Sequence, residues 1–190
     1  MALARLDLGS FPTPLQHVAD LGDAPELADL YLKRDDLTGF AWGGSKVRTV
    51  EFVLAEALDV GADALIVAGG PTSNFAALLA VAAASHGLPL TQVCYGRERG
   101  GAAALAVSIR AGATVEFTGS KERSSMDARA NELAATQRAE GLAPYVVPPR
   151  IRKHQRVSHP RAARRKGPGL QPVGACGFAA AAVELVVQLD

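Results

Sequence analysis

The sequence has little of what marks several common protein classes. It holds only two cysteines, Cys94 and Cys176, which lack C-x-x-C spacing and lie far apart, so a zinc knuckle and a disulfide framework are excluded. Residues 1–11 contain no apolar core of signal-peptide length. The longest apolar runs, 75–84 and 173–183, fall short of the ~20 residues that span a bilayer. We therefore expect a cytoplasmic protein that makes no membrane contact.

Two sequence motifs, one typical of hydrolases and one typical of dinucleotide-binding proteins, are also missing. The chain has no G-x-S-x-G sequence, which argues against the nucleophile elbow of a hydrolase. It has no G-x-G-x-x-G sequence either, which argues against a dinucleotide-binding fold. The fold and the chemistry must therefore be read from other patterns.

The net charge of +1 hides one strongly basic segment. Eight Lys or Arg and no acidic residue lie between positions 150 and 166; the rest of the chain holds 12 basic and 19 acidic residues, a net charge of −7. We expect residues 150–171 to be a basic insertion without packed structure, of the kind that out-of-frame reading of a GC-rich gene produces. The alternative is a nucleic-acid-binding arm, but interleaved aromatic residues are missing, so we expect no specific nucleic-acid partner.

Strand patterns alternate with helical patterns between residues 30 and 147. Short apolar runs predict strands at 30–33, 64–67, 90–95, 114–117 and 145–147, and helical spacing predicts helices at 46–60, 75–85, 102–110 and 125–139. This alternation is typical of βαβ units, so we expect an α/β fold with a parallel twisted sheet and helices on both faces. A last helix is expected from about residue 179 onward.

The first candidate for chemistry is the segment Gly43-Gly44-Ser45-Lys46. Paired glycines let a backbone approach a ligand closely. A lysine in the first turn of a helix opposes the positive end of the helix dipole, which favours the neutral amine that a Schiff base requires. The alternative is a solvated lysine after a flexible turn. A phosphate-binding P-loop is excluded, because the glycine spacing is wrong.

Two further loops carry polar groups. In Gly69-Gly70-Pro71-Thr72-Ser73-Asn74, hydroxyls, an amide and backbone N–H groups converge before a helix, which suits an anion; the alternative is that Ser73 only caps the helix. Asp35 and Asp36 stand side by side, but no His or Cys accompanies them at ligand spacing, so we expect a turn with internal ion pairs and no metal site. Because Lys46 and Asn74 both follow predicted strands of one parallel sheet, we expect them at the same edge of the sheet.

Taken in order, these motifs resemble the D-cysteine desulfhydrase and 1-aminocyclopropane-1-carboxylate deaminase family, which uses pyridoxal phosphate and has the tryptophan-synthase-β-like fold (fold type II). The likeness covers residues 11–149 and 172–190. It is carried by Phe11-Pro12-Thr13-Pro14-Leu15, Leu32-Lys33-Arg34-Asp35-Asp36-Leu37-Thr38-Gly39, Gly43-Gly44-Ser45-Lys46-Val47-Arg48, Gly69-Gly70-x-x-Ser73-Asn74, Pro144-Tyr145-Val146-Val147-Pro148 and Gly174-Ala175-Cys176-Gly177-Phe178.

The resemblance implies a role for three residues. Lys46 would hold the cofactor covalently and handle the Cα proton, Asn74 would hydrogen-bond the ring hydroxyl of the cofactor, and Ser73 with its loop amides would face the substrate carboxylate. The implied reaction is a lyase or deaminase reaction on a small amino acid. It would release pyruvate, ammonia and sulfide from D-cysteine, or a keto acid and ammonia from a cyclopropane amino acid. Full-length relatives are expected to be homodimers.

The sequence also departs from the family. Ser45 replaces a usual Asn and Thr49 a usual Lys; Thr72, Phe75 and Phe178 replace a usual Gln, His and Tyr, so the substrate-facing surroundings differ. We expect three segments: 1–149, an N-terminal α/β region that includes the small domain; 150–171, the insertion; and 172–190, a resumed family segment of an incomplete second domain. The family's phosphate-binding loop would lie beyond Asp190. The chain is thus either an impaired lyase or deaminase, or an inactive fragment with at most a structural or partner-binding role.

Overall fold

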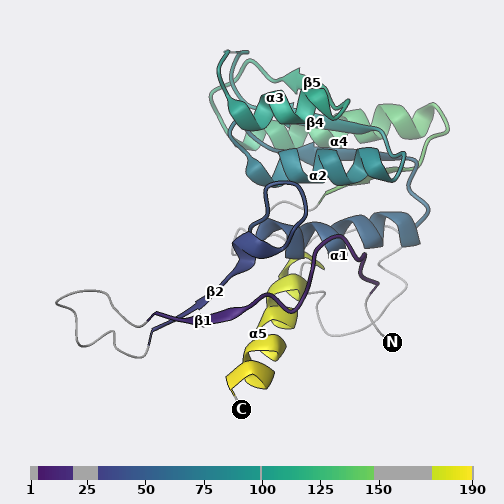
Figure 1. Cartoon of the computed structure of the whole chain (residues 1–190). Coiled ribbons are helices and arrows are strands. Elements are labelled where there is room, and N and C mark those ends of the chain that lie inside the picture. The colour runs from purple at the N-terminus through teal and green to yellow at the C-terminus, as the bar shows by residue number, and fades with distance from the viewer. Residues whose placement is uncertain (1–3, 19–29, 99, 148–172, 190) are drawn as a thin grey trace.

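The computed structural model of the chain describes residues 4–18, 30–98, 100–147 and 173–189. The predicted basic insertion, 150–171, and the landmark Pro148 lie outside the described residues. The described elements (Figure 1) are β1 (Leu15–His17), β2 (Tyr31–Lys33), the 3-10 helix η2 (Asp35–Leu37), α1 (Lys46–Asp59), β3 (Ala64–Ala68), α2 (Asn74–Ser85), β4 (Leu90–Cys94), α3 (Ala103–Arg110), β5 (Thr114–Phe117), α4 (Ser124–Ala139), β6 (Pro144–Val146), the 3-10 helix η4 (Val173–Ala175) and α5 (Cys176–Leu189).

The main sheet has four parallel strands in the order β5-β4-β3-β6. Helices α1 and α2 cover one face and α4 covers the other, while α3 packs beside α2 (Figure 1). Strand β3 is an unbroken apolar run because it is central in the sheet and buried on both faces. The predicted α/β fold with a parallel sheet is confirmed.

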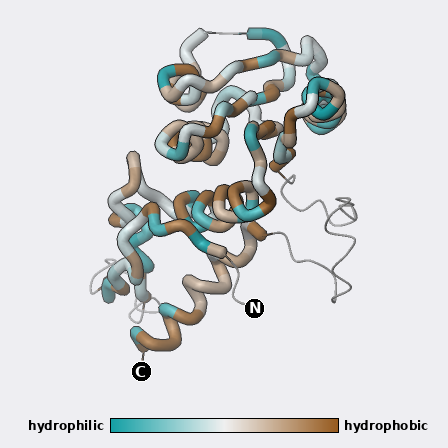
Figure 2. The backbone as a smooth tube through the Cα atoms, turned by 90° about the vertical axis from the view of Figure 1, so that its right-hand side faces the viewer, coloured by the Kyte–Doolittle hydropathy of each residue, from teal (hydrophilic) through white to brown (hydrophobic). Residues whose placement is uncertain are grey.

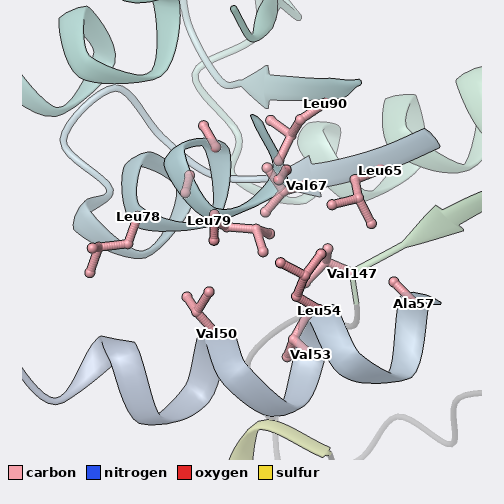
Figure 3. Packing of buried hydrophobic residues seen from close by; sticks show 14 of the residues in the cluster. Val50, Val53, Leu54, Ala57, Leu65, Val67, Leu78, Leu79, Leu90 and Val147 are labelled. Atoms are coloured by element: carbon pink, nitrogen blue, oxygen red, sulfur yellow. The ribbon is translucent and has the colours of Figure 1, made fainter. Parts of the chain in front are cut away.

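The larger core lies between α1, α2 and the sheet (Figure 3). Val50 and Leu54 of α1 point toward Leu79 of α2 and toward β3, where Val67 lies in the same cluster. All four side chains are at most 1% exposed. Because interiors pack as densely as organic crystals, this contact sets the position of α1 relative to α2, and with it the relation between the two loops that precede these helices.

One expectation about the sheet is wrong. Strand β2 does lie where a strand is predicted, but it is not part of the parallel sheet. It pairs antiparallel with β1, and Leu15 lies opposite Lys33. The sequence pattern does not predict β1, because a strand of only three residues is too short to show a periodic pattern.

Helix α5 begins at Cys176, three residues earlier than expected, and crosses α1 (Figure 1). A Cβ at Gly177 would overlap the carbonyl of Arg48, so glycine allows the two helices to approach closely. Much of α5 is apolar and exposed, and most of the helix is tan to brown in Figure 2; the exposed large apolar residues are Phe178, Val183, Val186, Val187 and Leu189. None of the described helices is long and apolar enough to cross a membrane.

Candidate functional site

Two glycines shape the loop that leads into α1. Gly43 and Gly44 have φ angles of 74° and 92°, a backbone region in which a side chain is strained. Gly43 N–H donates to the carbonyl of Phe40 at 2.8 Å, and Gly44 N–H donates to the carbonyl of Asp35 at 2.8 Å. A Cβ at Gly43 would also overlap the Asp36 carbonyl. The loop ends at Ser45, the N-cap, so Lys46 is the first residue of α1, as predicted.

The turn with the paired carboxylates supports this loop. Arg34 forms an ion pair with Asp36 at 2.7 Å, and its hydrogen bond lowers the pKa of the Asp36 carboxyl. The Asp35 carboxylate binds the buried Arg48 at 2.8 Å. The predicted turn with internal ion pairs is therefore confirmed, and both carboxylates have cationic partners of their own. The turn also holds Gly44, because the backbone carbonyl of Asp35 accepts the Gly44 N–H.

The second loop enters α2 at a well-formed cap. Ser73 has extended backbone angles, and its Oγ accepts a hydrogen bond from the Ala76 N–H at 3.2 Å. The capping interpretation of Ser73 is thus correct. A hydroxyl that accepts one bond still has its own proton to donate, so capping leaves Ser73 able to bind an anion. Asn74 follows as the first residue of α2 and is exposed.

The two loops meet at one cavity of about 310 Å³. It brings Lys46 and Asn74 together, whereas Ser73 lies next to the cavity and is not among the residues that line it; the lining residues are Asp36, Trp42, Gly43, Gly44, Ser45, Lys46, Asn74 and Leu78. Lys46 Nζ lies 3.5 Å from Ser45 Oγ. The predicted proximity of Lys46 and Asn74 is correct.

The reason expected for that proximity is wrong. Lys46 follows the antiparallel strand β2 by way of η2, so it does not stand at the end of a parallel strand. The packing of α1 against α2 brings the two helix starts together instead. Trp42 was missed in the sequence, because a single aromatic residue before two glycines carries no pattern. Its side chain is 46% exposed and forms part of the cavity wall.

The cavity offers a defined set of chemical groups. It has a primary amine from Lys46, an amide from Asn74, a carboxylate from Asp36, and apolar surface from Trp42 and Leu78. Its volume is at the lower end of the range for small-molecule sites. An amine at such a site can bond covalently to an aldehyde, while the amide and the apolar surface hold the rest of a flat ligand.

The known proteins that this chain resembles are enzymes. A family profile described as "Pyridoxal-phosphate dependent enzyme" matches residues 6–157. A D-cysteine desulfhydrase of Salmonella typhi is 31% identical over 98% of this chain and 52% of its own length. A mitochondrial bifunctional D-cysteine desulfhydrase/1-aminocyclopropane-1-carboxylate deaminase of Arabidopsis thaliana is 37% identical over 74% of this chain and 37% of its own.

Solved structures agree on the fold. An ACC deaminase homologue superimposes with a TM-score of 0.77 at 30% identity, over 98% of this chain and 51% of that one. A maize serine racemase superimposes with a TM-score of 0.63 at 16% identity, over 93% of this chain and 44% of the racemase, which supports the fold alone. The chain spans about half the length of the curated relatives that match nearly all of it.

Proposed function

Because the chain belongs to the pyridoxal-phosphate dependent enzyme family, we propose that Lys46 is its cofactor lysine and that its reaction is a lyase or deaminase reaction on a small amino acid. The substrate would be of the D-cysteine or 1-aminocyclopropane-1-carboxylate type, after the names of its relatives. The observation that carries this proposal is that Lys46 and Asn74, from the first turns of two different helices, line the same cavity.

The residues of the cavity fit the ring and the aldehyde of pyridoxal phosphate. The cofactor is a flat aromatic aldehyde, and the cavity supplies an amine for the aldehyde and apolar surface for the ring. Gly43 and Gly44 keep the loop free of side chains next to Lys46. Asn74 supplies an amide that can hydrogen-bond a ring hydroxyl.

Each residue then has a proposed role. When bound, the cofactor supplies a pyridine ring that withdraws electrons from the substrate Cα. The Lys46 amine would hold the cofactor and, once released from it, accept or return the Cα proton. The Asn74 amide would orient the ring. The Ser73 hydroxyl, which accepts from Ala76 N–H, would donate its own proton in a hydrogen bond to the substrate carboxylate.

Covalent labelling tests the role of Lys46. The chain is incubated with pyridoxal phosphate and reduced with borohydride, and the labelled peptides are mapped by mass spectrometry. We expect the label on Lys46 and its loss in Lys46→Ala. Lys121, an exposed lysine in the loop before α4, serves as the control for unspecific labelling, and Lys121→Ala should leave the Lys46 label unchanged. Equal labelling of both lysines would refute the assignment.

Turnover separates the active enzyme from the inactive fragment. Release of sulfide and pyruvate from D-cysteine, measured with Lys46→Ala as the blank, would establish a lyase. Labelling at Lys46 without turnover would support the second proposal, an inactive fragment with at most a structural or partner-binding role, which the half-length match to relatives favours. We also propose that the chain has three segments, 1–149, 150–171 and 172–190, and that the protein forms a homodimer. A reducing, cytoplasmic location is proposed as well, because it suits the free thiols of Cys94 and Cys176.

A further inference from the structure

A buried amide stands beneath the loop that precedes α2. Gln92 lies on β4 and is 1% exposed. In the sheet register it pairs with Val67, and like Leu90 it points to the face that α1 and α2 cover. A glutamine in an apolar layer loses its hydration, and among the described residues only the nitrogen end of the Gln92 amide regains hydrogen bonds, whereas its Oε1 has no partner. Its partners therefore indicate what it does.

Those partners are the backbone carbonyls of the loop. Gln92 Nε2 donates to the Gly69 carbonyl at 2.8 Å and to the Gly70 carbonyl at 3.3 Å. Two carbonyls can accept only from the nitrogen end of the amide, so the orientation of the Gln92 side chain is fixed. Cys94 Sγ supports the same contact and donates to the Gly69 carbonyl at 3.1 Å. Burial raises the pKa of the Cys94 thiol to about 11, so the sulfur keeps the proton that it donates.

This contact decides which way the peptide between Gly69 and Gly70 faces. In a trans peptide the C=O and the following N–H point in opposite directions. With the Gly69 carbonyl turned to Gln92, the N–H of Gly70 points away from Gln92. Within the described part of the chain, that N–H has no hydrogen-bond acceptor. Tyr95 limits movement of the loop further, because a Cβ at Gly70 would come within 2.7 Å of its ring.

We propose that Gln92 is a positioning residue, which holds the carbonyls of Gly69 and Gly70 inward so that the Gly70 N–H and the capped start of α2 face a substrate carboxylate. The inference rests on the proposed function, because the carboxylate is that of the amino-acid substrate. Gln92 itself is buried below the loop and acts only through it.

Two substitutions separate this role from simple packing. Gln92→Met keeps the length of the side chain and removes the donor. Gln92→Glu keeps the shape but turns an acceptor toward two carbonyls, which repels them. Val93→Ala is the matched control, since Val93 is equally buried on the same strand but faces α4, away from the loop. It should lower stability but leave in place the Val93 carbonyl, which accepts the Gly69 N–H at 3.0 Å.

The readouts are ligand affinity and hydrogen exchange of the whole chain. D-alanine, which has the carboxylate but no β leaving group, is titrated into the chain loaded with pyridoxal phosphate, and absorbance gives its dissociation constant. We expect Gln92→Met to weaken D-alanine binding on the order of tenfold, the effect of about one lost hydrogen bond, with little change in cofactor affinity. Gln92→Glu should weaken it further. The backbone amides of residues 72–76 should exchange faster than in the wild type in both Gln92 variants. In Val93→Ala they should exchange at the wild-type rate.

The outcomes separate the inference from the proposed function. Unchanged D-alanine affinity and unchanged exchange in Gln92→Met would overturn the inference while Lys46 labelling leaves the proposed function intact. If Gln92→Met changed D-alanine affinity and exchange only as much as Val93→Ala does, Gln92 would contribute packing alone. That result would also overturn the inference. A wild-type chain that takes up no cofactor at Lys46 would overturn the proposed function, and with it the carboxylate role of the loop.

Discussion

Arg48 of α1 and Glu184 of α5 form a two-point ion pair across 136 positions of sequence. Nη1 of Arg48 lies 2.8 Å from Oε1 of Glu184, and Nη2 lies 2.9 Å from Oε2. Arg48 binds Asp35 at the same time, and Lys33 reaches Glu184 at 2.9 Å. Because Arg48 lies two residues after Lys46, the cluster joins α5 to the helix that bears the proposed cofactor lysine.

Removal of the Glu184 charge should weaken the fold. The Arg48 side chain is 1% exposed, so Glu184→Gln leaves a buried guanidinium with one carboxylate partner fewer. We expect the free energy of unfolding to fall by about 3 kcal/mol, near the lower end for breaking a buried ion pair. Urea unfolding followed by circular dichroism measures it. Glu132→Gln is the control, since its pair with Arg129 is exposed, and a change of about 0.3 kcal/mol is expected. Equal effects of the two substitutions would contradict a buried cluster.

The same pair should make stability depend on pH. Burial alone would raise the pKa of Glu184, but hydrogen bonds from Arg48 and Lys33 outweigh it and lower the pKa from 4.5 to about 2. A lowered folded-state pKa stabilises the fold above the unfolded-state value, and this contribution is lost as pH falls from about 4.5 toward about 2. The stability advantage of the wild type over Glu184→Gln should therefore shrink across that range. Urea midpoints of both proteins between about pH 7 and about pH 3 test this; a constant difference would contradict it.

The Lys46 loop should tolerate no side chain at Gly43. Gly43→Ala places a Cβ against the Asp36 carbonyl and forces a residue with φ 74° into a strained region. Gly61→Ala is the matched control, because Gly61 has a φ of 69° but open space around a Cβ. We expect Gly61→Ala to cost about 1 kcal/mol from strain alone and Gly43→Ala to cost about 1–3 kcal/mol more from the overlap. Thermal unfolding measures both, and labelling at Lys46 should be lost only in Gly43→Ala.

Two substitutions at Ser73 separate its cap from its proposed contact with substrate. Ser73→Ala removes the acceptor for the Ala76 N–H and should cost about 1 kcal/mol of stability. Ser73→Asp restores a good cap, so stability should return to near the wild-type value. The added negative charge should nevertheless repel a carboxylate, and D-alanine binding should be weaker in Ser73→Asp than in Ser73→Ala. Recovery of D-alanine binding together with stability would mean that Ser73 is a cap only.

Much of the fold is readable from local patterns. The apolar run of β3 and the helical spacing in α1 and α2 predict these elements to within one or two residues. Ser73 before an apolar helix predicts its cap, and the structure has it. The β1–β2 pair is not readable from the sequence, because strands of only three residues lack periodicity and pair by tertiary contact. The start of α5 was placed too late, because Gly177 disfavours a helix locally and is accepted only for its close approach to Arg48.

The sequence alone determined that Lys46 begins a helix after two glycines, that Ser73-Asn74 begins another, and that parallel strands separate the helices. Only the tertiary structure decided that these two helix starts share a cavity, that Trp42 forms part of its wall, and that Gln92 holds the second loop. The physical reason is the range of the forces involved. Turn and helix preferences act between neighbours in sequence, whereas the meeting of side chains from different elements depends on how α1 and α2 pack against the sheet.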